Sequence, residues 1–131
     1  MSQVYILVVD DEPDVRQLML DALESLGLKG RAVTNGREAI EAIQAEPPAL
    51  VLLDLMMPGM DGFSALARLQ RDRELRTIPI VIMSALADTD RQLYDFPGVI
   101  GVMPKGGFDL RRLRMLLKRA GILEDDPPII A

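Results

Sequence analysis

Apolar residues along the chain follow two spacings, short unbroken runs and longer segments with a helical period. The unbroken runs lie at residues 4–9, 50–53, 79–83 and 99–103, whereas residues 28–33, which include Lys29 and Arg31, suit a weaker strand. Runs of this length, bounded by turn residues, predict strands that are buried on both faces. Their alternation with helical segments predicts right-handed crossovers and a parallel sheet with helices on both faces. We therefore expect one α/β domain built on a doubly wound, five-stranded parallel sheet.

Five helical segments accompany these strands. The first begins at Pro13 and stops at Gly27, because proline suits a first helical turn and glycine a helix end. Asn35, followed three positions later by Glu38, is typical of the start of the second. The side chains expected to face the core in the first, second, third and fifth helices are Val15, Leu18, Met19, Ala22, Leu23 and Leu26; Ala39, Ile40 and Ile43; Phe63, Leu66 and Ala67; and Leu110, Leu113, Leu117 and Ala120.

The remaining helical segment, residues 85–96, is polar and predicts only a weak or irregular fourth helix. Asp109 is positioned to cap the fifth helix. The end of the chain, residues 124–131, is acidic and contains two prolines. We expect this tail to be disordered and residues 1–123 to form the single domain.

Composition narrows the classes of function. The 131 residues include no cysteine and no histidine, which excludes a thiolate metal site, a cysteine nucleophile and a histidine phosphodonor within the chain. The net charge of −5 and the scarcity of aromatic residues argue against binding to nucleic acid. No apolar stretch approaches the length that spans a membrane. We expect a cytoplasmic protein whose partners are neither nucleic acid nor membrane.

Polar side chains with complementary chemistry follow four of the predicted strands. Asp10 and Asp11 follow the first strand, Asp54 ends the third, Ser84 ends the fourth and Lys105 follows the fifth. The carboxyl ends of parallel strands share one edge of a sheet, so these side chains should converge. Clustered carboxylates favour a hard cation such as Mg²⁺, and a lysine favours an anion. Together they indicate phosphoryl transfer to an aspartate.

Each of these residues also has an ordinary structural interpretation. Asp10 and Asp11 could cap the first helix, and Asp54 could be a polar strand end. A single Ser84 or Lys105 is usually a loop serine or a solvated lysine. The functional interpretation depends on the four strand ends carrying this chemistry together.

The joint pattern resembles the response-regulator receiver domain of two-component signalling, over roughly residues 4–120. The motifs that carry the resemblance are Val8-Val9-Asp10-Asp11-Glu12, Leu52-Leu53-Asp54-Leu55-Met56-Met57-Pro58-Gly59-Met60-Asp61-Gly62, Ile82-Met83-Ser84-Ala85 and Pro104-Lys105. The resemblance implies a flavodoxin-like fold with strand order 2-1-3-4-5. It further implies a stand-alone signalling module rather than a turnover enzyme.

The resemblance also assigns roles to residues. Asp54 would accept a phosphoryl group from a sensor histidine kinase or a histidine phosphotransfer protein. Asp10, Asp11, Asp54 and the backbone carbonyl of Met56 would bind Mg²⁺. Ser84 would contact the phosphoryl group and Lys105 would pair with it. Phosphorylation would then switch binding of a downstream protein to the face formed by residues 85–120, in a monomer or weak dimer.

Two positions depart from the family pattern. The family usually has proline after the matching lysine, whereas this chain has Gly106-Gly107. We therefore expect a trans Lys105-Gly106 peptide bond and a loop at residues 104–108 shaped differently from the family's, which the two glycines can absorb through positive φ angles. The family's aromatic switch position is held by Val102, whose side chain has no ring to swing between two states. Both departures concern the route of the output signal rather than the phosphorylation chemistry.

Three other functions fit parts of the pattern. A haloacid-dehalogenase-like phosphatase needs a second acid two residues after its nucleophile, where this chain has Met56. A flavodoxin needs a phosphate loop after the first strand, where Asp10, Asp11 and Glu12 would repel phosphate. A receiver-like scaffold that is never phosphorylated is disfavoured by the intact Asp54, Ser84 and Lys105.

Overall fold

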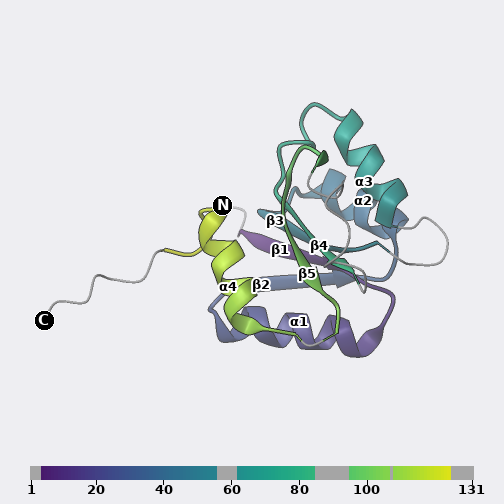
Figure 1. The fold of residues 1–131 in the computed structure, drawn as a ribbon. Coiled ribbons are helices and arrows are strands. Elements are labelled where there is room, and N and C mark those ends of the chain that lie inside the picture. Colours follow the sequence, from purple (N-terminus) through teal and green to yellow (C-terminus); the bar gives the residue numbers. More distant parts are fainter. Residues whose placement is uncertain (1–3, 56–61, 85–94, 107, 125–131) are drawn as a thin grey trace, which may run out of the picture.

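The computed structural model describes residues 4–55, 62–84, 95–106 and 108–124. Five strands form one parallel sheet in the order β2-β1-β3-β4-β5, so the predicted flavodoxin-like topology is confirmed (Figure 1). The strands are β1 (Tyr5–Val9), β2 (Lys29–Val33), β3 (Leu50–Asp54), β4 (Ile80–Ser84) and β5 (Val99–Pro104).

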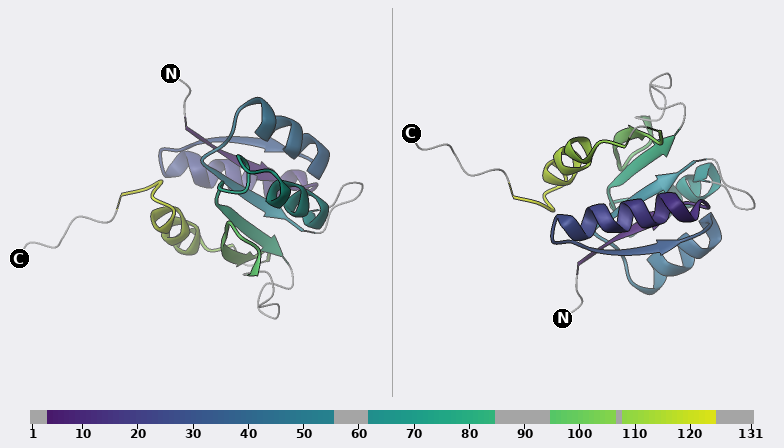
Figure 2. Two further views of the ribbon diagram at one scale, coloured as in Figure 1. Left: turned by 90° about the horizontal axis from the view of Figure 1, so that it is seen from above. Right: turned by 90° about the horizontal axis from the view of Figure 1, so that it is seen from below.

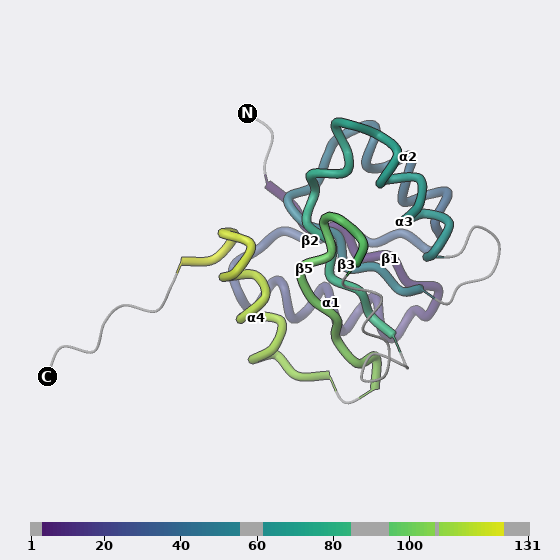
Figure 3. The backbone as a smooth tube through the Cα atoms, turned by 45° about the horizontal axis from the view of Figure 1, so that its top comes forward, coloured from purple at the N-terminus to yellow at the C-terminus, as the bar shows by residue number. Residues whose placement is uncertain are grey.

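In the part of the chain that the structure describes, two helices cover each face of the sheet. Among the described residues the helices are α1 (Pro13–Ser25), α2 (Gly36–Ala45), α3 (Gly62–Arg71) and α4 (Leu110–Arg119). Helices α1 and α4 pack on one face, and α2 and α3 pack on the other (Figure 2). Figure 3 shows α2 and α3 side by side. Helix α4 is the predicted fifth helix, and most of the predicted fourth helix, residues 85–94, lies outside the described residues.

Successive side chains of a strand point to opposite faces of the sheet, so each strand contributes to two separate cores. In β1, Leu7 and Val9 face α2 and α3, whereas Ile6 and Val8 face α1 and α4. The other central strands alternate in the same way, and all five residues of β3 are buried. Because the sheet is covered on both faces, its central strands are apolar throughout except at their carboxyl ends.

The predicted helix starts are confirmed by their hydrogen bonds. The Asn35 side chain accepts a bond of 2.8 Å from the backbone N–H of Glu38, and Glu38 accepts one of 2.8 Å from the backbone N–H of Thr34. The Asp109 side chain likewise accepts a bond from the backbone N–H of Arg111. These bonds satisfy amides that a helix leaves unpaired at its start.

Three predicted core residues are exposed instead. Leu18, Phe63 and Leu110 lie on α1, α3 and α4, and each has a large exposed fraction. Helical spacing indicates which side of a helix is apolar, but the contact with the sheet decides how much of that side is covered. In α1, for example, Met19, Ala22 and Leu23 fill that contact. Within the described residues, the structure has no helix long and apolar enough to cross a membrane.

Candidate functional site

The sheet brings the sequence-predicted residues to one edge. Asp10 follows β1, Asp54 ends β3, Ser84 ends β4 and Lys105 follows β5. The register of neighbouring strands places their carboxyl ends side by side, because Asp54 pairs with Met83 and Ser84 pairs with Pro104. The side chains of Asp10, Asp54 and Ser84 are buried, with exposed fractions of 0%, 1% and 4%. Two aspartates buried this deeply require charge compensation, since an unpaired carboxylate is poorly tolerated away from water.

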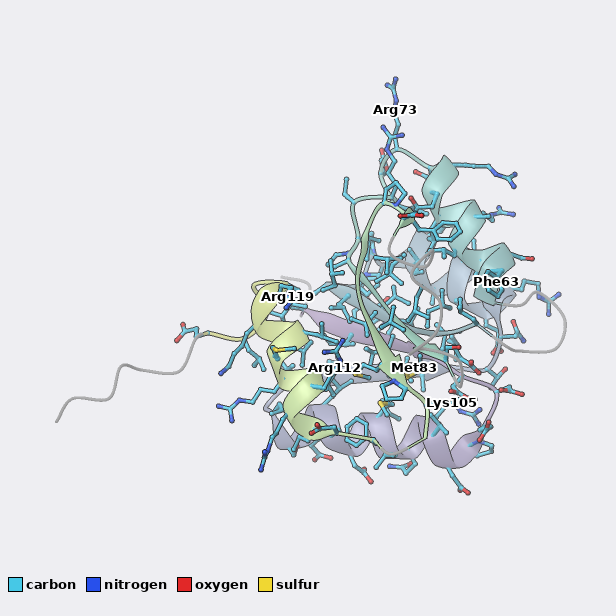
Figure 4. All side chains as sticks on the ribbon, viewed as in Figure 1. Phe63, Arg73, Met83, Lys105, Arg112 and Arg119 are labelled. Carbon is cyan, nitrogen blue, oxygen red and sulfur yellow. The ribbon has the colours of Figure 1, made fainter. Side chains whose placement is uncertain are left out.

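Lys105 supplies that compensation. Its ammonium nitrogen, Nζ, lies 2.9 Å from Asp54 Oδ2, 3.3 Å from Asp10 Oδ1 and 2.7 Å from Glu12 Oε1. Figure 4 shows Lys105 at the end of β5, on the side of the molecule where α1 begins. Burial alone would lower the pKa of Lys105, but the hydrogen bonds and charges of Glu12, Asp54 and Asp10 outweigh it and raise the pKa. The lysine is therefore a fixed positive charge at neutral pH.

Asp10 has one satisfied and one unsatisfied oxygen. Its Oδ1 accepts a bond of 2.8 Å from the backbone N–H of Glu12 and faces Lys105. Its Oδ2 is buried and has no hydrogen-bond partner among the described residues. Burial raises the pKa of Asp10, and the nearby charge of Asp54 raises it further, while the Glu12 amide and Lys105 act in the opposite direction. Arg16 fixes the backbone by donating to the Asp10 carbonyl at 2.9 Å.

The donor set around Asp10 fits a hard cation. One carboxylate oxygen from each of Asp10, Asp11 and Glu12 lies within 4.8 Å of the others. Oxygen donors of this kind suit Mg²⁺, which also retains bound waters. The buried, unpartnered Oδ2 of Asp10 is an independent sign that a cation belongs here, because buried polar atoms ordinarily have partners. Met56, predicted to offer its carbonyl, lies outside the described residues.

Ser84 is linked to the site through the backbone. It is the last residue of β4, and its carbonyl accepts a bond of 3.1 Å from the backbone N–H of Lys105. This bond ties the end of β4 to the residue that follows β5. The predicted position of Ser84 at the shared edge is therefore confirmed.

Two features of the site were missed by sequence reasoning. The Glu12 side chain reaches Lys105, although the sequence marks it only as part of an acidic motif. Gly62 packs against the backbone of Asp54, since a Cβ at Gly62 would lie 2.1 Å from the Asp54 carbonyl oxygen and 2.4 Å from Leu55 Cα. The sequence signal for Gly62 is its place in the motif that follows Asp54, but a motif does not by itself indicate a close approach between two segments of backbone.

The two departures from the family pattern have different outcomes. There is no cis peptide bond among the described residues, so the predicted trans Lys105-Gly106 bond is confirmed. Gly106 does not use the positive φ that glycine allows: its φ lies outside that region, and the chain passes this residue without a left-handed turn. Gly107 lies outside the described residues. Val102 is buried in β5, and its carbonyl accepts a bond of 3.1 Å from Arg112.

Comparison with known proteins agrees with this geometry. The family model for the response regulator receiver domain matches residues 6–116. The chain is 32% identical over 121 residues to the DNA-binding transcriptional regulator NtrC of Escherichia coli, covering 92% of this chain and 25% of NtrC. The chain thus spans about a quarter of the length of that curated relative.

Solved structures give the same result. A sensor protein from Polaromonas sp. JS666 superposes with a TM-score of 0.80 and 29% identity, covering 91% of this chain and 96% of that one. The receiver domain of sensor histidine kinase PA1611 from Pseudomonas aeruginosa superposes with a TM-score of 0.78 and 25% identity, covering 92% and 99%. That structure has a magnesium ion coordinated in its active site cleft.

Fold and site together define a doubly wound α/β domain with a cluster of acidic side chains at the carboxyl edge of its sheet. The chain belongs to the response regulator receiver domain family of two-component signalling.

Proposed function

We propose that this domain is a phosphorylation-controlled signalling receiver in which Asp54 accepts a phosphoryl group. The donor is the phosphohistidine of a sensor histidine kinase or a histidine phosphotransfer protein, since the chain itself contains no histidine. The observation that carries the proposal is the contact of 2.9 Å between Asp54 Oδ2 and Lys105 Nζ, beside Asp10 Oδ2, which has no partner among the residues that the structure describes.

In this reaction a carboxylate oxygen of Asp54 attacks the phosphorus, the new O–P bond forms and the N–P bond to the donor imidazole breaks. Lys105 stabilises the negative charge on the transferring group, and the Ser84 hydroxyl donates to one of its oxygens. Asp10, Asp11 and Asp54 would hold Mg²⁺, which supplies positive charge to the phosphoryl oxygens. Burial of Asp54 keeps bulk water from the nucleophile.

The output of such a receiver is a change in protein binding rather than turnover of a small substrate. We place the partner surface on the face of residues 85–120, of which 95–106 and 108–120 are described. Helix α4 on this face carries five basic residues and no acid, and its Met115 is exposed among them. This surface suits an acidic protein partner of a monomeric or weakly dimeric domain in the cytoplasm.

Hydrogen exchange tests the output surface. Beryllofluoride with Mg²⁺ mimics the phosphoryl group, and we expect it to change exchange in residues 85–98 and 104–108, with α2 as an unaffected reference. A change confined to the surroundings of Asp54 would show that the output surface lies elsewhere.

Intact-mass measurement tests the phosphorylation itself. With Mg²⁺ and acetyl phosphate, the wild-type domain should gain one phosphoryl group and Asp54→Asn should gain none. Asp109→Asn, which removes an exposed helix-capping acid away from the site, is the matched control and should label like wild type. Equal labelling of wild type and Asp54→Asn would contradict the proposal.

A further inference from the structure

Within the described residues, three carboxylates contact the ammonium group of Lys105, so each of its donors has a partner. A lysine ammonium carries three N–H donors. Lys105 has three carboxylate partners, Asp10, Asp54 and Glu12, and the shortest of the contacts is the one to Glu12 at 2.7 Å. A phosphoryl oxygen that approaches Lys105 must therefore replace one of these partners.

The three partners differ in what their release would cost. The side chains of Asp10 and Asp54 have exposed fractions of 0% and 1%, so releasing either one leaves a buried carboxylate without its counter-charge. The side chain of Glu12 is 58% exposed and returns to water when it is released. Glu12 is therefore the partner that leaves most readily.

The backbone holds Glu12 in place for this contact. Glu12 is the N-cap residue of α1, with an extended backbone at φ −89° and ψ 119°, yet its side chain makes no capping hydrogen bond. Its backbone N–H is held by Asp10 Oδ1 at 2.8 Å. The Glu12 carboxylate does not cap the helix and instead contacts Lys105, which lies 93 positions later in the chain.

We propose that Glu12 is a positioning residue that occupies, in the unphosphorylated domain, the Lys105 donor that an incoming phosphoryl oxygen takes over. The inference rests on the proposed phosphorylation of Asp54. Its consequence is that Glu12 competes with the phosphoryl group and lowers the affinity of the site for it. The proposal assigns Glu12 a role toward Lys105 and not toward the metal.

Beryllofluoride titrations at saturating Mg²⁺, followed by NMR, test this role. Glu12→Gln removes the charge, and Glu12→Asp keeps the charge but shortens the reach to Lys105. Both should tighten beryllofluoride binding, by roughly two- to fivefold, which is the range expected for a partly exposed ion pair. Asp14→Asn removes a neighbouring exposed acid from the first turn of α1 and should leave the affinity unchanged.

A spectroscopic readout separates positioning from a general effect on structure. The NMR signal of the Lys105 ammonium should shift in both Glu12 variants before any ligand is added, and it should not shift in Asp14→Asn. Thermal unfolding checks that the variants are folded, which we expect because the Glu12 side chain is mostly exposed.

Five outcomes would overturn the inference. Unchanged beryllofluoride affinity in both Glu12 variants would show that the contact does not compete. An equal effect in Asp14→Asn, or an effect in Glu12→Gln but not in Glu12→Asp, would show that the charge acts through space rather than by holding Lys105. Weaker Mg²⁺ binding in both Glu12 variants, measured without beryllofluoride, would make Glu12 a metal ligand. If wild type itself binds no beryllofluoride, the proposed function fails and this inference fails with it.

Discussion

Lys105 Nζ lies 2.9 Å from Asp54 Oδ2, although 51 positions separate the two residues in the chain. The contact joins the end of β3 to the residue after β5, across the end of β4 that lies between them in the sheet. It makes one lysine the counter-charge of two buried carboxylates, those of Asp54 and Asp10. Stability and reactivity of this edge therefore depend on the same ion pairs.

Removal of the lysine charge should destabilise the fold. Lys105→Met leaves two buried carboxylates without their cation, and we expect the free energy of unfolding at neutral pH to fall by roughly 3 kcal/mol. Urea unfolding measures this change. Lys29→Met, at an exposed lysine in the edge strand β2, is the control and should change stability by less than about 0.5 kcal/mol. Similar losses in the two variants would mean that the buried pairs are not what Lys105 stabilises.

Neutralising Asp10 should have the opposite effect, and the effect should depend on pH. Because burial and Asp54 raise the pKa of Asp10, its contribution to stability is full below the ordinary carboxyl pKa and is lost as pH rises through the raised pKa. Asp10→Asn cannot ionise and avoids that loss, while Lys105 keeps Asp54 and Glu12 as partners.

Urea unfolding across the pH range checks this sign. The stability of Asp10→Asn relative to wild type should increase as pH rises from below about 4, the ordinary range of an aspartate, to neutrality. A stability difference for Asp10→Asn that shrinks with rising pH would contradict the assignment of a raised pKa to Asp10.

The metal site has a separate test in Asp11. Asp11→Ala removes one carboxylate from a cluster of like charges, so the domain should remain folded while losing Mg²⁺ binding and phosphorylation together. Mg²⁺ titration followed by NMR and labelling by acetyl phosphate measure the two losses. Asp14→Ala should retain both properties. Normal labelling of Asp11→Ala in the presence of Mg²⁺ would remove Asp11 from the metal site.

Gly62 positions Asp54 by allowing close contact between two segments of backbone. A Cβ at this position would meet the Asp54 carbonyl oxygen at 2.1 Å, and backbone cannot move aside as a flexible side chain can. We expect Gly62→Ala to lower the free energy of unfolding by about 1–3 kcal/mol and to slow labelling of Asp54. At Gly106 a Cβ would meet none of the described residues within 4 Å, so Gly106→Ala should unfold like wild type.

The sequence predicted the site well because the chemistry lies at strand ends. Asp10, Asp54, Ser84 and Lys105 could be assigned to one edge once parallel strands were inferred, since all such strands end on the same side. The order of the strands in the sheet was implied by the family resemblance, and the observed order agrees.

Features that depend on side-chain reach or on exact packing were not predictable in this way. The Glu12–Lys105 contact depends on where an exposed side chain turns, which hydrophobic periodicity does not record. The exposure of Leu18 and Phe63 follows from how much of each helix the sheet covers. The close approach of Gly62 to Asp54 exists only once the strand, the turn and the helix are assembled.

Phosphorylation of Asp54 is the central claim, and chemical trapping tests it at the level of the residue. Borohydride reduces an acyl phosphate to an alcohol, so a phosphorylated aspartate becomes homoserine, which peptide mass spectrometry can locate. After treatment with acetyl phosphate and Mg²⁺, we expect homoserine at position 54 and at no other acid. Homoserine at Asp10, Asp11 or Glu12, or none at position 54 in a labelled sample, would contradict it.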